Sequence, residues 1–241
     1  MNLFYDPTIT FSPAIPLPFL HFLNEEESRH CVKVLRMRVG NEVYLTNGQG
    51  FLFTGKLCTL NPGSCEIEIT ALTKHEPADY SIHIAVAPIK NMSRFEWFLE
   101  KATEIGINEV TPLICARSEK ISVRTDRMNK IITAALKQSL GVFHPILNEP
   151  VGYKKFLEKT RESGKYIGWC ETKDEPLFTS ICLPRKDVVV LIGPEGDFTA
   201  EEVVLAKETG YLPISLGNNR LRTETAALAA CFAVHFVNGK I

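Results

Sequence analysis

The sequence predicts an α/β protein made of a small antiparallel β-domain followed by a larger domain with a mostly parallel sheet. Between residues 43 and 70, short apolar runs are separated by the turn signals Asn47-Gly48 and Asn61-Pro62-Gly63. After residue 80, strand-like runs alternate with helical ones, which favours a parallel sheet covered by helices on both faces. With 241 residues, 45% of them hydrophobic, the chain is long enough to bury a sizeable core.

The first domain is expected over residues 1–72. Val32, Leu35 and Val39 recur at helical spacing, so we expect one helix over residues 25–37 that packs on the strands. Polar residues 73–80 contain Pro77 and are typical of a linker. The strands of this domain are expected at 43–46, 51–57 and 66–70.

The second domain is expected over residues 81–241. Its first helix carries Ser93 and Glu96 at capping-box spacing and ends before Gly106, which tolerates the left-handed conformation of a helix C-terminus. Strands are expected at 81–87, 109–115, 165–170, 187–193 and 212–217. Helices are expected at 93–105, 125–140, 151–163, 199–209 and 223–237.

Two glycine-containing loops, IGPEGD and SLGNNRLR, each follow a strand and precede a helix. Ligands bind beyond the carboxyl ends of parallel strands, where helices begin. Thr199 and Glu202 predict a capping box after the first loop, and Gly196 admits unusual dihedral angles. Such turns often need glycine for steric reasons only, but Glu195 and the LRTET run are more polar than a turn requires. Neither loop matches a nucleotide-binding GxGxxG or GxxxxGK[ST] pattern.

The composition limits the possible partners. The 27 basic and 28 acidic residues give a net charge of −1, so any surface that binds nucleic acid is local. Seven cysteines lack CxxC spacing and histidines at zinc-ligand intervals, which indicates reduced structural thiols and no metal. Neither a signal peptide nor an apolar run long enough for a membrane span is found, so we expect a cytoplasmic protein.

Five motifs together resemble the bacterial ribosomal RNA small subunit methyltransferase E family, which is part of the SPOUT superfamily of knotted methyltransferases. They are HCVKVLRMRVGNEVYLTNGQG, KATEIGINEVTPLICARS, KQSLGVFHP, IGPEGDFTAEE and SLGNNRLRTETAAL. The resemblance covers nearly the whole chain. It implies an N-terminal PUA-like β-barrel that binds RNA, a C-terminal SPOUT domain with a deep trefoil knot, and a homodimer. It further implies methylation of uracil N3 in the 16S rRNA of the 30S subunit.

The resemblance also implies S-adenosylmethionine as cofactor, held by three loops. By matching position, the first wall is the loop near Leu113. The second comprises Ile192, Gly193, Pro194, Glu195 and Gly196, and the third comprises Ser215, Leu216, Gly217, Leu221 and Thr223. Glycine lets backbone groups approach such a ligand closely.

Arg222 and Glu224 are the candidate catalytic residues. Methyl transfer to uracil N3 needs a nitrogen that is losing its proton, and a guanidinium would stabilise the developing anion. Glu224 would orient Arg222 or accept the proton. The alternative interpretation is an Arg222–Glu224 ion pair that only stabilises the loop.

Two basic clusters are candidate RNA contacts, although charge runs are often only solvated faces. They comprise Arg29, His30, Lys33, Arg36 and Arg38 in the first domain and Arg117, Lys120 and Arg124 in the second. His83 and His235 lie in apolar stretches and are expected in the core.

The chain departs from the family pattern at Asp197, at Asn219-Arg220 and at Leu140-Gly141-Val142. Two other functions therefore stay open. One is a knotted methyltransferase that acts on tRNA or on a ribose 2′-hydroxyl. The other is a catalytically silent RNA-binding factor in ribosome assembly.

Overall fold

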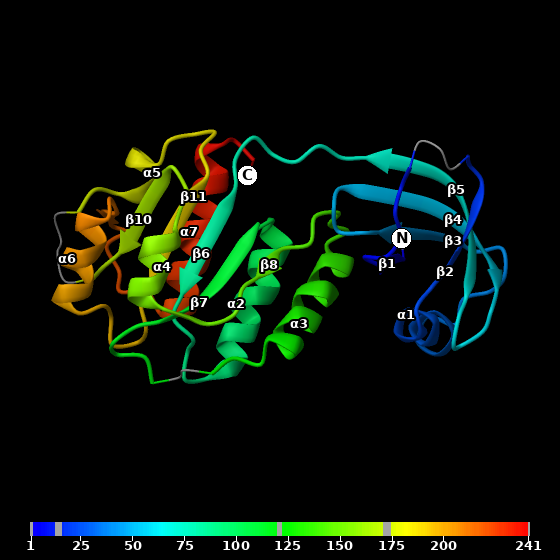
Figure 1. Ribbon diagram of the computed structural model, residues 1–241, viewed down its shortest axis with the longest axis horizontal. Helices are drawn as coiled ribbons and strands as arrows, with labels where there is room; N and C mark the ends of the chain where they lie inside the picture. The colour runs from blue at the N-terminus through cyan, green and yellow to red at the C-terminus, as the bar shows by residue number, and fades with distance from the viewer. Residues whose placement is uncertain (1, 13–15, 120–121, 171–174, 241) are drawn as a thin grey trace. The chain divides into compact units, whose positions relative to one another are not determined.

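Residues 2–12, 16–119, 122–170 and 175–240 are described by the computed structural model (Figure 1). Contacts within the chain divide it into two compact units. The first comprises Met1–Pro77 and Leu136–His144, and the second comprises Ala78–Ala135 and Pro145–Ile241. The N-terminal unit therefore includes a short segment from the middle of the chain.

The first unit contains a five-stranded sheet with the order β1-β3-β4-β5-β2 among its described residues. The β1–β3 pair is parallel, and the other neighbours are antiparallel. The strands are β1 (Leu3–Tyr5), β2 (Phe19–Phe22), β3 (Glu42–Thr46), β4 (Phe51–Thr59) and β5 (Glu66–Lys74). Alternate side chains, among them Val43, Leu45 and Phe53, are fully buried in one core. The three strands expected between residues 43 and 70 are confirmed.

The helix expected over residues 25–37 is shorter and irregular. α1 (Glu25–Arg29) begins after Asn24, whose side chain caps it, and a π-helical turn η1 (His30–Val34) follows directly. Arg36 then takes a φ of +50°, which ends the helical path. As a result Val39, expected on the packed face, is 60% exposed.

Segment 136–144 joins the first unit through backbone hydrogen bonds and side-chain contacts, among them an ion pair of Lys137 with Glu27 at 2.7 Å. The carbonyl of Val142 accepts a hydrogen bond from the Gly50 N–H at 2.8 Å, and the His144 N–H donates to the Gly48 carbonyl at 2.9 Å. The His144 ring also stacks on Tyr5, with the centroids 4.8 Å apart. Because the hydrogen bonds do not depend on side chains, the unusual Leu140-Gly141-Val142 sequence is compatible with this contact.

The second unit is built on a sheet with the order β12-β10-β11-β6-β7-β8, and β9 also pairs with β7. Every described pair in this sheet is parallel, as predicted. The strands are β6 (Ile82–Val86), β7 (Glu109–Ile114), β8 (Ile146–Leu147), β9 (Val151–Gly152), β10 (Gly164–Gly168), β11 (Val188–Ile192) and β12 (Leu212–Ile214). The helices are α2 (Met92–Ile105), α3 (Thr125–Gln138), α4 (Tyr153–Lys159), α5 (Phe178–Ile181), α6 (Ala200–Glu208) and α7 (Thr223–Val237).

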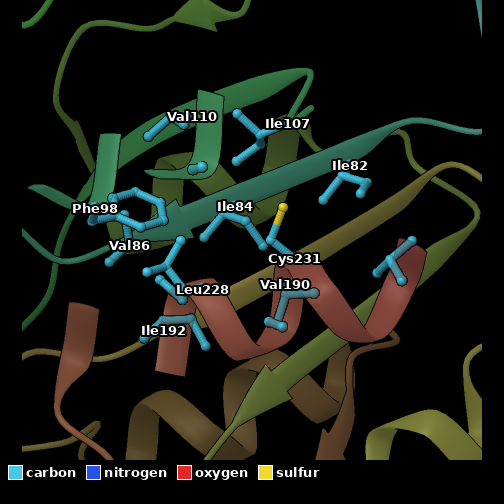
Figure 2. Packing of buried hydrophobic residues seen from close by; sticks show 14 of the residues in the cluster. Ile82, Ile84, Val86, Phe98, Ile107, Val110, Val190, Ile192, Leu228 and Cys231 are labelled. Atoms are coloured by element: carbon cyan, nitrogen blue, oxygen red, sulfur yellow. The ribbon is translucent and has the colours of Figure 1, made fainter. Parts of the chain in front are cut away.

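Helices cover both faces of this sheet. Alternate residues of each strand point to opposite faces, so apolar side chains on both faces need a covering layer. On one face, Ile84 and Val190 pack in a cluster with residues of α2 and α7, such as Phe98 and Cys231 (Figure 2). On the other face, residues of β11 pack with α4 and α6. The central strands are therefore buried on both sides, as their continuous apolar sequences predict.

The ends of three helices test the capping predictions. The capping box of Thr199 and Glu202 is confirmed at α6, and Gly106 ends α2 in the left-handed conformation with a φ of +104°. The predicted cap at Ser93 is wrong, because the side chain of Asn91 accepts the Ser93 N–H and begins α2 earlier. The helix expected from residue 151 begins at Tyr153, since β9 pairs with β7 first.

None of the described helices combines the length and the apolar character needed to cross a membrane.

Candidate functional site

Three strands of the second unit end side by side. β10 lies between β11 and β12, and Gly168 at its end is in register with both Ile192 and Ile214. The loops that follow these strands therefore share one edge of the sheet. Two of them are the glycine-containing loops for which the sequence predicts a ligand site.

The first glycine-containing loop, residues 193–197, is tightly packed. Gly193 and Pro194 are buried, and a side chain on Gly193 would lie 3.2 Å from the Phe198 ring. Thr223, the first residue of α7, donates its hydroxyl to the Gly193 carbonyl at 3.1 Å. The residue with unusual dihedral angles is Asp197, with a φ of +62°, and not Gly196 as expected. Aspartate tolerates this left-handed conformation better than most residues do.

Asp197 also connects this loop to the end of β10. Its carboxylate accepts a hydrogen bond from the Cys170 N–H at 3.0 Å and another from the Phe198 N–H at 2.8 Å. Burial and the neighbouring Asp197 carboxylate raise the pKa of the Cys170 thiol, although Arg220 opposes the shift. The departure from a glycine at position 197 thus has a structural role.

Two more predicted site residues hold the same loop. Arg117 donates from Nη1 to the carbonyls of Gly196 at 2.8 Å and Phe198 at 3.3 Å. Glu195 accepts a hydrogen bond from the Lys90 N–H at 3.0 Å. The guanidinium of Arg117 therefore stabilises the conformation of this loop. The charge pattern of the sequence does not predict this contact.

The second glycine-containing loop begins at the end of β12. Ser215 exchanges backbone hydrogen bonds of 2.9 Å with Pro176 and Phe178, and its neighbour Leu216 is half-buried. Gly217 is exposed and takes a φ of +124°, which favours glycine. Its N–H donates to Oγ of Ser215 and its carbonyl accepts from the same hydroxyl, both at 3.3 Å, so the loop is held to the end of β12.

Leu113 does not join the other predicted cofactor residues. It lies in β7, is fully buried, and is separated from β11 by β6. The loop that does adjoin the other two begins at Gly168 and includes Trp169 and Cys170. The sequence has this glycine inside the strand expected over residues 165–170, and the order of strands in the sheet was needed to identify the loop that adjoins the other two.

An open pocket of about 540 Å³ lies between the N-terminal turns of α2 and α7. It adjoins the second glycine-containing loop and includes both candidate catalytic residues. The lining residues are Ser93, Arg94, Trp97, Arg220, Leu221, Arg222, Glu224 and Thr225.

Arg222 and Glu224 have different surroundings. Arg222 is the exposed N-cap residue of α7, and its side chain makes no capping hydrogen bond. Glu224 is only 6% exposed, and its carboxylate Oε1 lies 3.8 Å from Nε of Arg94 on α2. Glu224 thus forms its ion pair with Arg94, a partner that the sequence pattern does not predict. The loop-stabilising Arg222–Glu224 pair is not present among the described interactions.

Most of the candidate RNA contacts are exposed. Lys33, Arg36 and Arg38 are exposed in the first unit, and His30 is half-buried. Arg29 is exposed but forms an ion pair with Glu25. Arg124 of the second unit is exposed, and Lys120 lies outside the described residues.

Both histidines expected in the core are buried. Nδ1 of His235 and the Tyr80 hydroxyl form a hydrogen bond of 2.7 Å. His83 and Glu109 lie at the amino ends of β6 and β7, and Glu162 precedes β10; their possible metal-ligand atoms lie within 4.8 Å of one another. Because both His83 nitrogens already form hydrogen bonds, an ion would have to displace one of those partners.

Family comparisons match both units. Residues 76–235 match a family model described as an RNA methyltransferase domain, and residues 23–70 match one described as an RNA methyltransferase PUA domain. The expected order, a PUA domain followed by an α/β domain with a parallel sheet, is confirmed.

Curated relatives cover most of the chain. The ribosomal RNA small subunit methyltransferase E of Mesomycoplasma hyopneumoniae is 30% identical over 224 residues, which cover 86% of this chain and 94% of the relative. The protein of the same name from Rickettsia conorii is 29% identical over 211 residues, with 86% of each chain covered.

Solved structures agree in fold over nearly the full length. A probable rRNA methyltransferase from Porphyromonas gingivalis has a TM-score of 0.89 and 33% identity, with 99% of both chains covered. A ribosomal RNA small subunit methyltransferase E from Neisseria gonorrhoeae, bound to S-adenosyl methionine, has a TM-score of 0.88 and 28% identity, covering 99% of this chain and 98% of that chain. The chain therefore belongs to the ribosomal RNA small subunit methyltransferase E family.

Proposed function

We propose that this protein is an S-adenosylmethionine-dependent methyltransferase that methylates N3 of a specific uridine in 16S rRNA. The observation that carries the proposal is the edge where β10, β11 and β12 end beside the pocket of Arg222 and Glu224. The names of the curated relatives support the substrate class. Two similar solved structures, from Legionella pneumophila and Neisseria gonorrhoeae, hold the same cofactor.

The proposed cofactor site comprises Ile192–Gly196, Ser215–Gly217, Leu221 and Thr223. We place the loop of Gly168–Cys170 as its third wall, in place of Leu113. These residues fit a ligand that packs close to the main chain, because Gly217 is exposed and has no side chain that would keep a ligand away. S-adenosylmethionine, when bound, supplies an electrophilic methyl group.

The proposed chemistry of the protein is to prepare uracil N3 for attack. Arg222 stabilises the negative charge that develops on the uracil ring as N3 loses its proton. Glu224 accepts this proton or orients the groups that receive it. Arg94 holds the buried Glu224 carboxylate in place from the neighbouring helix.

RNA binding is the proposed task of the first unit. Arg29, His30, Lys33, Arg36 and Arg38 would contact phosphates, together with Arg124 of the second unit. We further propose a 30S subunit or 16S rRNA as the substrate, a homodimer as the active form, a trefoil knot in the second unit, and a location in the cytoplasm. Sedimentation at several concentrations tests the homodimer.

Analysis of 16S rRNA from a strain that lacks the gene tests the proposed function. We expect nucleoside mass spectrometry to show loss of one 3-methyluridine, which returns when the gene is supplied. Purified protein should also bind S-adenosylmethionine in calorimetry and transfer its methyl group to the unmodified 16S rRNA. Loss of a tRNA or ribose mark instead would contradict the assigned substrate, and an unchanged rRNA would contradict the methylation itself.

A further inference from the structure

The pocket beside Arg222 contains an exposed tryptophan to which the proposed chemistry gives no task. Trp97 belongs to the second turn of α2 and is 46% exposed. It lines the same pocket as Arg222 and Glu224. An exposed indole among charged side chains is a surface on which a planar group can stack.

The charges around Trp97 favour an anionic ligand. Three guanidinium groups line the pocket, from Arg94, Arg220 and Arg222, against the single carboxylate of Glu224. The pocket thus carries a formal charge of +2, from three positive groups and one negative group.

The start of α7 adds to this preference. The first N–H groups of a helix lack partners within the helix and form the positive end of its dipole. A full capping box satisfies such groups at α6, whereas Arg222 gives α7 no side-chain cap. Glu224 and Thr225, in the first turn of α7, line the pocket. A phosphate fits this position.

We propose that this pocket binds one nucleotide extruded from the RNA, with its base stacked on Trp97 and its phosphate near the start of α7. The inference rests on the proposed function and names the part of the substrate that the pocket holds. Enzymes that modify a base must take it out of the stack, and an aromatic side chain then replaces the lost stacking. The pocket volume of about 540 Å³ lies within the range of small-ligand sites.

Fluorescence tests the stacking independently of catalysis, because the chain has only two tryptophans, Trp97 and Trp169. In the Trp169→Phe variant, a uridine hexanucleotide should quench the remaining Trp97 emission and saturate together with RNA binding measured by anisotropy. In Trp97→Phe, the emission of Trp169 should not change with the same titration. Absence of quenching in Trp169→Phe, or equal quenching in both variants, overturns the proposal.

Kinetics on unmodified 16S rRNA provide the second test. Trp97→Ala should lower kcat/KM by about 10-fold or more, and Trp97→Phe should restore most of it, since stacking needs only an aromatic ring. The matched control is Val204→Ala, which shortens an exposed apolar side chain on α6 and should leave the rate unchanged. If the wild-type protein is active and Trp97→Ala has the same kcat/KM, the stacking role alone is overturned. If the wild-type protein is inactive, the proposed function is contradicted.

Discussion

Arg94 on α2 places its guanidinium Nε 3.8 Å from the buried carboxylate of Glu224 on α7. The two residues belong to neighbouring helices, and both line the proposed base-binding pocket. The arginine side chain is 43% exposed, so the pair contributes less than about 1 kcal/mol to stability. Removal of this ion pair should therefore change the position of the Glu224 side chain more than it changes the free energy of unfolding.

We predict that Arg94→Met lowers kcat by about 10- to 100-fold and leaves the KM for S-adenosylmethionine unchanged, because Glu224 loses the group that positions it. Arg94→Lys should restore part of kcat. Arg127→Met is the matched control. Arg127 on α3 pairs with Glu96 on α2 at 2.7 Å, and neither residue lines the pocket. Steady-state kinetics measure the effect, and an equal loss in both variants would assign Arg94 a merely structural role.

Arg222→Ala should abolish most methyl transfer without loss of cofactor binding. The side chain is exposed and caps no helix N–H, so its removal should not unfold the protein. If it stabilises the uracil anion, kcat should fall by about 100- to 1,000-fold. Single-turnover rates and calorimetry with S-adenosylmethionine separate the two effects. Arg161→Ala removes an exposed arginine from the opposite edge of the sheet and serves as control; full activity in Arg222→Ala would refute the role.

Asp197 is predicted to hold the cofactor loop by its backbone conformation and by its hydrogen bond to Cys170. Asp197→Ala keeps neither feature and should weaken S-adenosylmethionine binding by about 10-fold and stability by roughly 1–2 kcal/mol. Asp197→Asn keeps an acceptor oxygen and tolerates the left-handed conformation, so it should remain close to wild type. Asp197→Gly takes the left-handed conformation without strain but lacks the carboxylate, so it isolates the effect of the hydrogen bond to Cys170. If glycine binds the cofactor as well as aspartate does, the contact with Cys170 is dispensable.

The basic residues of the first unit should appear in the salt dependence of RNA binding. Each phosphate contact that is lost reduces the slope of log K against log salt by about 0.7–0.9. We expect Arg38→Ala to reduce the slope by this amount, and Arg29→Ala by less, because Glu25 already neutralises Arg29. Lys74→Ala, another exposed and paired residue, is the control. Filter binding at several salt concentrations measures the slopes, and no change for Arg38→Ala would remove that residue from the interface.

Local sequence patterns predicted the central strands and the longer helices, but not the short elements β1, β2, β8, β9 and α5. Central strands such as β6 and β11 are buried on both faces, so their apolar runs are unambiguous. The Thr199 capping box depends on residues that are close in sequence, and it was confirmed. The cap of α2 was misplaced because Asn91 and Ser93 are both good N-cap residues, and the sequence alone did not decide between them.

Contacts between distant segments were not predictable in this way. The order of β10, β11 and β12 in the sheet differs from their order in the chain, so the adjacent loop at Gly168 was not distinguished from the loop near Leu113. Arg117 was expected to contact RNA because of its charge, whereas its guanidinium donates to the backbone of Gly196. Both outcomes depend on tertiary packing, which periodicity does not encode.

Glu162 provides a test of the buried hydrogen bonds on the opposite edge of the sheet. Its carboxylate Oε1 lies 2.5 Å from Nδ1 of His83, and Nε2 of His83 lies 2.8 Å from the Thr111 hydroxyl. Asn148 donates to that hydroxyl, so the hydroxyl can donate to Nε2 and leave Nδ1–H for Glu162. Burial alone would raise the pKa of Glu162, but the hydrogen bonds from His83 and from backbone N–H groups lower it below the ordinary value of 4.5.

A carboxylate whose pKa is lower in the folded protein stabilises the fold fully above the unfolded pKa, and this stability is lost as the pH falls through the folded pKa. We therefore predict that Glu162→Gln lowers the free energy of unfolding by about 1–2 kcal/mol at pH 7. The difference from wild type should narrow below about pH 4, where the unfolded carboxyl takes up its proton. Urea titrations at pH 7 and below pH 4 measure this difference in the free energy of unfolding. Glu158→Gln, on the exposed face of α4, is the control. An equal loss at both pH values would show that the charge of Glu162 is not what stabilises this edge.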